Sequence, residues 1–335
     1  MLSSKITILI LSLLSLSNGI IAQGELPKCD NILDLIIVLD SSGSISQPDF
    51  AKAIDAMKSL VSLLKIGPKK VMITVINYSS NVQIPITFAD MKLSTFSIQW
   101  LISKIATLQH MQGGTDTALA LLEAKRVCDT TCRSFNEGVA RSVVVFTDGQ
   151  SNSPSETAKQ AAALRSTTQV NIYAVGIGGY NLAELKAIAS DPNYVFTMSN
   201  YQQLTVLIND ITNKTCMMPA FVQPNTKVNT EVPANTYRYY RMDTSKLRSG
   251  SGGFFELTAD VTKGSTRVFT SATNTNPQAG SSREVTLQLK GTQQHYLEYI
   301  EPGTPKYYFS VLGVDPVNEF EFTPRILDMN GGVIG

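Results

Sequence analysis

Three separate segments of the chain carry oxygen-bearing side chains that could together hold a hard metal ion. The first, residues 40–44 (DSSGS), directly follows the apolar run 35–39. The second is residues 113–115 (GGT), and the third is an aspartate that follows the apolar run 142–146. Two carboxylates and three hydroxyls form a donor set that suits Mg²⁺ better than a soft metal. The candidate ligands are Asp40, Ser42, Ser44, Thr115 and Asp148.

Apolar runs rich in β-branched residues are typical of buried parallel strands, and here such runs alternate with helical patterns. This alternation predicts an α/β fold with a doubly wound, mostly parallel sheet, whose strand ends gather the candidate ligands. The strands are expected at 35–39, 71–78, 82–88 (antiparallel), 143–146, 170–175 and 194–197. The helices are expected at 50–64, 96–108, 115–127, 155–165, 182–190 and 201–215.

The sequence pattern changes after residue 216. Residues 217–235 contain three prolines and several Asn and Thr residues, which predicts a linker. Beyond it, short alternating segments separated by Gly, Ser, Asn and Pro predict a smaller all-β sandwich over residues 236–326, similar in texture to jelly-roll modules. Its strands are expected at 237–242, 254–261, 267–270, 285–289, 296–300, 307–312 and 320–323.

The three ligand-bearing segments also carry a family resemblance. The stretches DLIIVLDSSGSIS, QGGTDTAL and VVVFTDGQSN resemble a von Willebrand factor type A domain, and the likeness covers residues 29–216. The resemblance implies a metal-ion-dependent adhesion site (MIDAS) made by the five candidate ligands. It implies Mg²⁺ as the cofactor, with Mn²⁺ or Ca²⁺ as alternatives, and a partner that presents Glu or Asp.

The type of A domain is also indicated. The short connection between Val175 and Leu182 leaves no room for the extra helix of collagen-binding integrin domains. The chain is therefore more similar to A domains of matrix proteins, such as matrilins, nonfibrillar collagens and mussel byssal thread matrix proteins. Collagen or another matrix protein is a candidate partner, although this feature does not itself indicate collagen.

Residues 1–22 predict a secretory signal peptide, because Lys5 precedes an apolar run at 8–16 that is too short to span a bilayer. We therefore expect a secreted, extracellular protein without membrane insertion. Four cysteines in such a chain predict two disulfides, for which three pairings exist. Cys29 and Cys216 bracket the A-like domain and would match the bridge of many extracellular relatives. Cys128 and Cys132 are close enough for a local bridge.

Two glycosylation sequons begin at Asn77 and Asn213. Asp34 precedes the first buried strand and is expected at the surface. Asp116, beside the candidate ligands, would interact with a helix dipole or support the metal site.

Other function classes find little support. The net charge of +1 gives no electrostatic case for nucleic-acid binding. With two histidines and no nucleophile or metalloprotease motif, the chain is not expected to be an enzyme. We expect a matrix or adhesion protein. The alternatives are a structural matrix component that organises collagen fibres or mineral without strict metal dependence, and a secreted recognition protein of innate defence.

Overall fold

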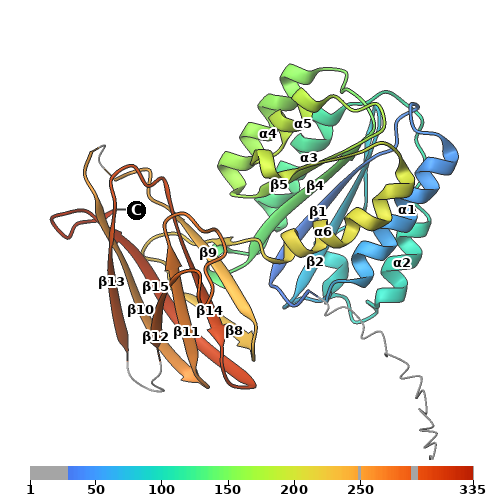
Figure 1. Ribbon diagram of the computed structural model, residues 1–335. Helices are drawn as coiled ribbons and strands as arrows, with labels where there is room; N and C mark the ends of the chain where they lie inside the picture. The colour runs from blue at the N-terminus through green and yellow to red at the C-terminus, as the bar shows by residue number, and fades with distance from the viewer. Residues whose placement is uncertain (1–28, 248–249, 288–292, 335) are drawn as a thin grey trace, which may run out of the picture.

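The computed structural model describes residues 29–247, 250–287 and 293–334. The predicted signal peptide lies outside these residues. Figure 1 shows an α/β domain followed by a separate all-β domain, as the sequence predicts. Within the described part of the chain, no helix is both long and apolar enough to cross a membrane.

The first domain contains a six-stranded sheet in the order β3-β2-β1-β4-β5-β6. All neighbours are parallel except β3, which is antiparallel to β2. The strands are β1 (Leu33–Asp40), β2 (Val71–Tyr78), β3 (Val82–Ile86), β4 (Ala140–Thr147), β5 (Asn171–Ile177) and β6 (Val195–Met198). Every residue of β1, β2 and β4 is buried, which explains their almost unbroken apolar sequences.

Helices cover both faces of this sheet. On one face α1 packs against α2 and α6, and on the other α3 and α5 flank α4. Their bounds are α1 (Gln47–Ser62), α2 (Ile98–Ala106), α3 (Thr117–Thr131), α4 (Pro154–Thr168), α5 (Leu182–Ile188) and α6 (Leu204–Cys216). Short 3₁₀ turns are η1 (Phe88–Lys92), η2 (Phe135–Glu137), η3 (Pro192–Tyr194) and η4 (Tyr201–Gln203).

The second domain is a sandwich of two five-stranded sheets. One sheet has the order β13-β10-β15-β16 with β8 also paired to β15, and the other has the order β12-β11-β14-β9-β7. Aromatic rings fill the space between them: Phe255 packs on Phe309 at 5.3 Å, and Tyr240 packs on Phe322 at 4.9 Å. The strands are β7 (Ala220–Phe221), β8 (Val228–Pro233), β9 (Tyr237–Asp243), β10 (Gly253–Lys263), β11 (Thr266–Ser271), β12 (Arg283–Leu287), β13 (Gln294–Ile300), β14 (Lys306–Gly313), β15 (Val317–Leu327) and β16 (Val333–Ile334).

The prediction that residues 217–235 form a linker is wrong for part of this segment. β7 pairs with β9, and β8 pairs with β15, so both belong to the sandwich. The prolines of this segment predicted a linker. Pro233, however, is the last residue of β8, where a missing amide hydrogen is tolerated. The sheet also runs past residue 326, because β15 ends at Leu327 and β16 follows it.

Two arginines of β9 join the sandwich to the α/β domain. Arg238 donates to the carbonyl oxygen of Asp30, and Arg241 donates to the carbonyl oxygen of Gln169 at 2.9 Å. Both side chains are buried, and Arg241 also lies over the ring of Phe221. The bonds attach β9 to main-chain atoms of the first domain.

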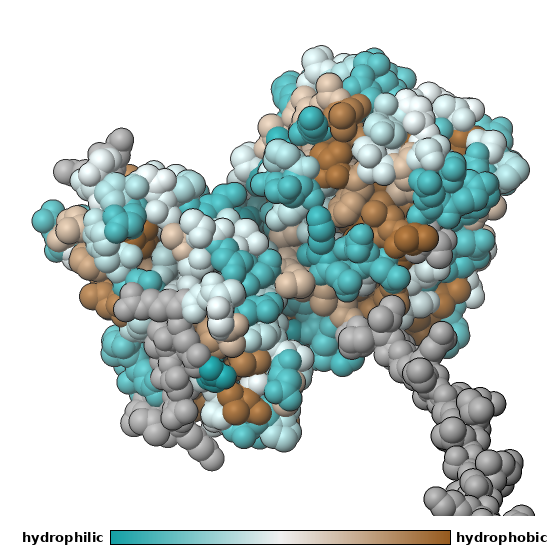
Figure 2. All heavy atoms as spheres, viewed as in Figure 1, coloured by the Kyte–Doolittle hydropathy of each residue, from teal (hydrophilic) through white to brown (hydrophobic). Residues whose placement is uncertain are grey.

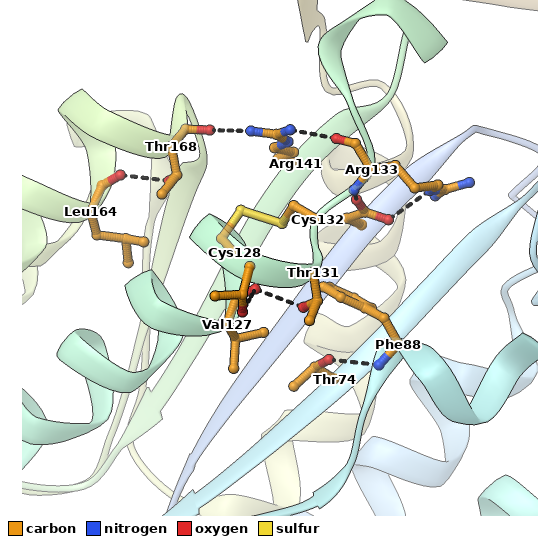
Figure 3. Close-up of a disulfide and its surroundings, with 12 residues drawn as sticks. Thr74, Phe88, Val127, Cys128, Thr131, Cys132, Arg133, Arg141, Leu164 and Thr168 are labelled. Atoms are coloured by element: carbon orange, nitrogen blue, oxygen red, sulfur yellow. Dashed lines mark hydrogen bonds and ion pairs between the residues drawn. A yellow bond between two sulfur atoms is a disulfide. The ribbon is translucent and has the colours of Figure 1, made fainter.

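Disulfides join Cys29 to Cys216 and Cys128 to Cys132, the pairings that the sequence favours. The first links the start of the α/β domain to the last residue of α6. The second closes the end of α3 and is shown in Figure 3.

The expectation that Asp34 lies at the surface is wrong, because Asp34 is buried in an ion pair with Arg133, the residue after the Cys128–Cys132 bridge. Arg133 donates its backbone amide and its Nε to the Asp34 carboxylate at 2.7 and 2.8 Å. The Asp34 side chain is fully buried in this ion pair. Arg141 in turn donates to the carbonyl oxygen of Arg133 (Figure 3). Asp34 is thus a structural acid at the end of β1 opposite the candidate ligands.

Candidate metal centre

The candidate ligands lie at the carboxyl ends of the two central strands. β1 and β4 are parallel neighbours, with Leu39 opposite Phe146. The chain passes from β1 outward to β2 on one side and from β4 outward to β5 on the other, so the strand order reverses here. Open α/β sheets form their ligand-binding crevices at such a reversal. Asp40 is the last residue of β1, and Asp148 directly follows β4.

Four of the five candidate ligands form one connected cluster. The Ser42 backbone amide donates to Asp40 Oδ1 at 2.8 Å, and the Ser42 and Ser44 hydroxyl oxygens lie 3.0 Å apart. The Ser44 hydroxyl then donates to Asp148 Oδ1 at 2.7 Å. Asp40 and Ser42 are each only 1% exposed, whereas Ser44 lies at the surface and Asp148 is half-buried. The cluster therefore has a deep side and an open side.

Thr115 reaches the same place on a third loop. The Gly43 amide donates to the carbonyl oxygen of Gly113, and the Gln112 amide donates to that of Ser41, both at 2.8 Å. These two bonds fix the 112–115 loop against the loop after β1. Among the described residues, no hydrogen bond joins Thr115 directly to the other four candidates. The structure places it beside them through the backbone of its loop.

Gly113 brings this loop close to two neighbouring serines. A Cβ atom on Gly113 would lie 2.8 Å from the hydroxyl oxygens of both Ser79 and Ser80. Real Cβ atoms do not approach other atoms so closely, so a larger residue would force the two serine side chains or the loop itself to shift. The close approach of Gly113 is therefore part of how Thr115 is positioned.

The two carboxylates in the cluster lack a cationic partner. Neither Asp40 nor Asp148 forms an ion pair with any residue that the structure describes, although Asp34 on the same strand as Asp40 pairs with Arg133. Burial raises the pKa of Asp40, and it also raises the pKa of Asp148. A buried carboxylate without a counter-charge is costly. This uncompensated charge, together with neutral hydroxyls, fits a divalent cation.

Three further residues support the site and were not identified from the sequence. The Thr147 hydroxyl donates to Asp40 Oδ2 at 2.8 Å. The Thr115 backbone amide donates to Asn152 Oδ1 at 3.2 Å, and the Asn152 backbone amide donates to the Thr115 carbonyl oxygen. His110 stacks on Phe50 and its Nε2 lies 3.2 Å from the carbonyl oxygen of Ser42. Only the parallel register of β1 and β4 could have indicated Thr147, because it places that residue beside Asp40.

The structure also bears on Asp116 and on the two sequons. Asp116 caps α3, since its side chain accepts from the Leu119 amide at 3.0 Å. The assignment of Asn77 as a glycosylation site is wrong for this fold. Asn77 is fully buried within β2, and its Nδ2, the atom that would carry a sugar, donates to the carbonyl oxygen of Gln109. Asn213, near the end of α6, is exposed.

The chain is similar to known proteins over its α/β domain. The family model for the von Willebrand factor type A domain matches residues 34–214, more than half of the chain. Mouse matrilin-2 is 30% identical over 56% of this chain and 20% of that protein, and the mouse collagen alpha-4(VI) chain is 32% identical over 58% and 8%. Chicken matrilin-3 is 27% identical over 55% and 40%. The chain thus spans less than half the length of each of these relatives.

Two similar solved proteins have TM-scores just under 0.5. Proximal thread matrix protein 1 from the mussel byssus has a TM-score of 0.49 and 23% identity, over 62% of this chain and 51% of that one. One structure of the same protein is described as having a zinc-occupied MIDAS motif. A type A protein from Catenulispora acidiphila has a TM-score of 0.47 and 16% identity, over 91% of this chain and 65% of that one.

Proposed function

The chain belongs to the von Willebrand factor type A domain family, and we propose that it is a secreted matrix or adhesion protein. Its α/β domain would bind an acidic side chain of an extracellular partner through a bound divalent cation. The supporting observation is the pair of carboxylates, Asp40 and Asp148, that lack a cationic partner beside a hydroxyl cluster. Matrilins and collagen VI chains among the relatives support an extracellular matrix setting.

The cation would be held by Asp40, Ser42, Ser44, Thr115 and Asp148. Two carboxylates would balance the charge of Mg²⁺, and three hydroxyls would add neutral oxygen ligands. Mn²⁺ or Ca²⁺ would fit the same oxygen donors. When bound, the ion would supply an electrophilic centre for a carboxylate oxygen of the partner. Because three of the five ligands would be neutral hydroxyls, the ion would remain electrophilic toward a further carboxylate oxygen.

The protein's own residues define the direction of approach. Asp40 and Ser42 form the buried floor, so a partner cannot reach the site from that side. Ser44 and the half-buried Asp148 form the open side. Thr147 and Asn152 hold the floor and the third loop in place. The partner's side chain would therefore enter between the loops after β1 and β4.

The partner class follows from this chemistry. A Glu or Asp side chain presented on an extracellular protein would satisfy the site, and collagen or another matrix protein is the candidate class. The sandwich would position the α/β domain or add a second contact. The proposal assigns binding and no catalysis.

A binding experiment with immobilised matrix extract tests this function. We expect retention of the protein in Mg²⁺, loss of retention in EDTA, and recovery when Mg²⁺ is restored in excess. Methyl esterification of the carboxylates in the extract should also abolish retention, because it removes the acidic side chains of the partner. Retention that is the same in EDTA and in Mg²⁺ would contradict the proposal and favour a metal-independent structural role.

A further inference from the structure

A pocket lies at the junction of the two domains, at the opposite end of the α/β domain from the metal centre. It has a volume of about 450 Å³, within the range of sites that hold small organic groups. The end of α6 and the Cys29–Cys216 bridge form one wall, and the start of β9 forms the other. In Figure 1 the yellow end of α6 approaches β9 at this junction. The pocket is therefore built by both domains.

Asn213 lines this pocket and begins the sequon Asn213-Lys214-Thr215. Its side chain is exposed to solvent, in contrast to the buried Asn77 of the other sequon. We infer that Asn213 carries an N-linked glycan whose first sugars occupy the interdomain pocket and contact both domains. The inference rests on the proposed secretion, since the modification takes place in the secretory pathway.

The lining of the pocket suits a sugar. The exposed amide side chain of Asn209 offers hydrogen-bonding groups, and Tyr237 and Tyr239 contribute aromatic residues. The Thr212 hydroxyl, also in the lining, is buried and has no hydrogen-bond partner within the described parts of the chain. Sugar hydroxyls can both donate and accept, so they could satisfy such groups. A purely apolar ligand could not.

The covalent step is a transfer from a polyprenyl-pyrophosphate-linked oligosaccharide, catalysed by the transferase of the host cell. The Asn213 Nδ2 forms a bond to C1 of the first sugar and loses one proton. The bond between C1 and the pyrophosphate oxygen breaks, and the lipid pyrophosphate leaves with the bonding electrons. Thr215 is only 2% exposed in the fold, so the transferase must read the sequon before α6 packs.

A docked glycan would fasten the two domains together at this junction. One wall of the pocket is attached to the sandwich through Arg238, which donates to the carbonyl oxygen of Asp30. Sugars that contact both walls would add contacts to this connection. The glycan would therefore limit movement of the sandwich relative to α6.

The first experiment asks whether Asn213 is modified. The full chain is secreted from cultured eukaryotic cells, and its glycopeptides are identified by mass spectrometry. We expect a glycan on Asn213 that is lost in Asn213→Gln and retained in Thr215→Ser, which keeps the sequon. An unmodified Asn213 in the secreted protein would overturn the inference.

The second experiment asks whether the glycan is docked. Peptide N-glycosidase should release it from the native protein about tenfold more slowly than from the denatured chain, because the attachment bond is covered. Asn209→Trp, which fills the pocket from an exposed position of α6, should restore fast native release, and Asn209→Ala should not. Equal release rates from native wild type and Asn209→Trp would overturn docking.

These outcomes are separable from the proposed adhesion. Asn213 lies at the opposite end of the α/β domain from the metal centre, so Asn213→Gln should leave Mg²⁺-dependent retention on matrix extract unchanged. If retention fails the chelator test while the glycan is docked, only the adhesion function is wrong.

Discussion

At the scale of single residues, β1 carries two buried aspartates with different surroundings. Asp34, near its start, is neutralised by Arg133, whereas Asp40, at its end, receives only neutral donors from Ser42 and Thr147. The first arrangement is complete without a ligand. The second leaves a buried negative charge that a cation would compensate. This contrast within one strand is the strongest argument for a metal at the end of β1.

Removing one carboxylate should therefore remove metal binding without unfolding the protein. Asp148→Ala is expected to lower the affinity for Mg²⁺ by at least about tenfold, because it deletes a charged oxygen ligand. Isothermal titration calorimetry measures the affinity, and thermal unfolding checks the fold. Asp55→Ala, a change at an exposed position of α1, is the control and should bind Mg²⁺ normally. Unchanged Mg²⁺ affinity in Asp148→Ala would count against the assignment.

A second residue-scale prediction concerns the close approach of Gly113. Gly113→Ala should displace the loop that carries Thr115, since the added Cβ would collide with two serine hydroxyls. We expect Mg²⁺ affinity to fall by about tenfold, comparable to loss of a supporting contact. Gly149→Ala is a matched control next to Asp148, because a Cβ there meets nothing within 4 Å. Equal affinities of the two variants would show that the loop has room to adjust.

The sequence predicted the candidate ligands because their types and order form a recognisable pattern. It did not predict Thr147 or Asn152, whose roles depend on strand register and on contacts between loops. It misplaced Asp34, because its partner Arg133 lies 99 residues away. Local sequence carries no signal for such a pairing.

At the scale of elements, hydrophobic periodicity predicted the helices and most of the strands. The apolar runs of β1, β2 and β4 are buried on both faces, so the pattern was strong. β7 and β8 were missed because they lie among prolines, and their pairing with β9 and β15 is non-local. Element bounds otherwise differ from the predicted ones by a few residues.

The two disulfides should differ in their effects on stability. The Cys29–Cys216 bridge closes a sequence separation of 187 residues, and the Cys128–Cys132 bridge closes one of 4. Chain-entropy reasoning gives a loss of about 5 kcal/mol in unfolding free energy for the first and about 2 kcal/mol for the second. Urea unfolding of Cys29→Ala/Cys216→Ala and of Cys128→Ala/Cys132→Ala measures both. A larger loss in the second variant would contradict this ranking.

At the scale of the whole molecule, the two domains are joined by buried polar groups as well as by the chain itself. Asp30 is central to the junction: Lys65 and Lys70 bind its carboxylate at 2.8 and 2.7 Å, and Arg238 of β9 reaches its carbonyl oxygen. Burial alone would raise the pKa of Asp30. The lysines and Arg238 outweigh this effect and hold the pKa below the ordinary value of 3.8.

This depressed pKa gives a pH dependence with a definite sign. Ionised Asp30 stabilises the folded state at pH values above 3.8, and this contribution is lost as the pH falls through the lower folded-state pKa. Asp30→Asn should therefore be less stable than wild type at pH 6, by about 1 kcal/mol because both lysines are partly exposed. The difference should shrink at pH 3.

Denaturant unfolding at the two pH values measures this effect, with Asp55→Asn as a control for an exposed aspartate. If the difference in unfolding free energy between wild type and Asp30→Asn stays constant from pH 6 to pH 3, the ion pairs of Asp30 with Lys65 and Lys70 do not stabilise the folded protein.

Anomalous diffraction from crystals of the protein grown with Mn²⁺ tests directly whether the metal centre holds a divalent cation. We predict one anomalous peak at the end of β1, enclosed by the oxygen atoms of Asp40, Ser42, Ser44, Thr115 and Asp148. The absence of a peak at this position, with the metal found elsewhere or not at all, would contradict the claim that this cluster holds a divalent cation.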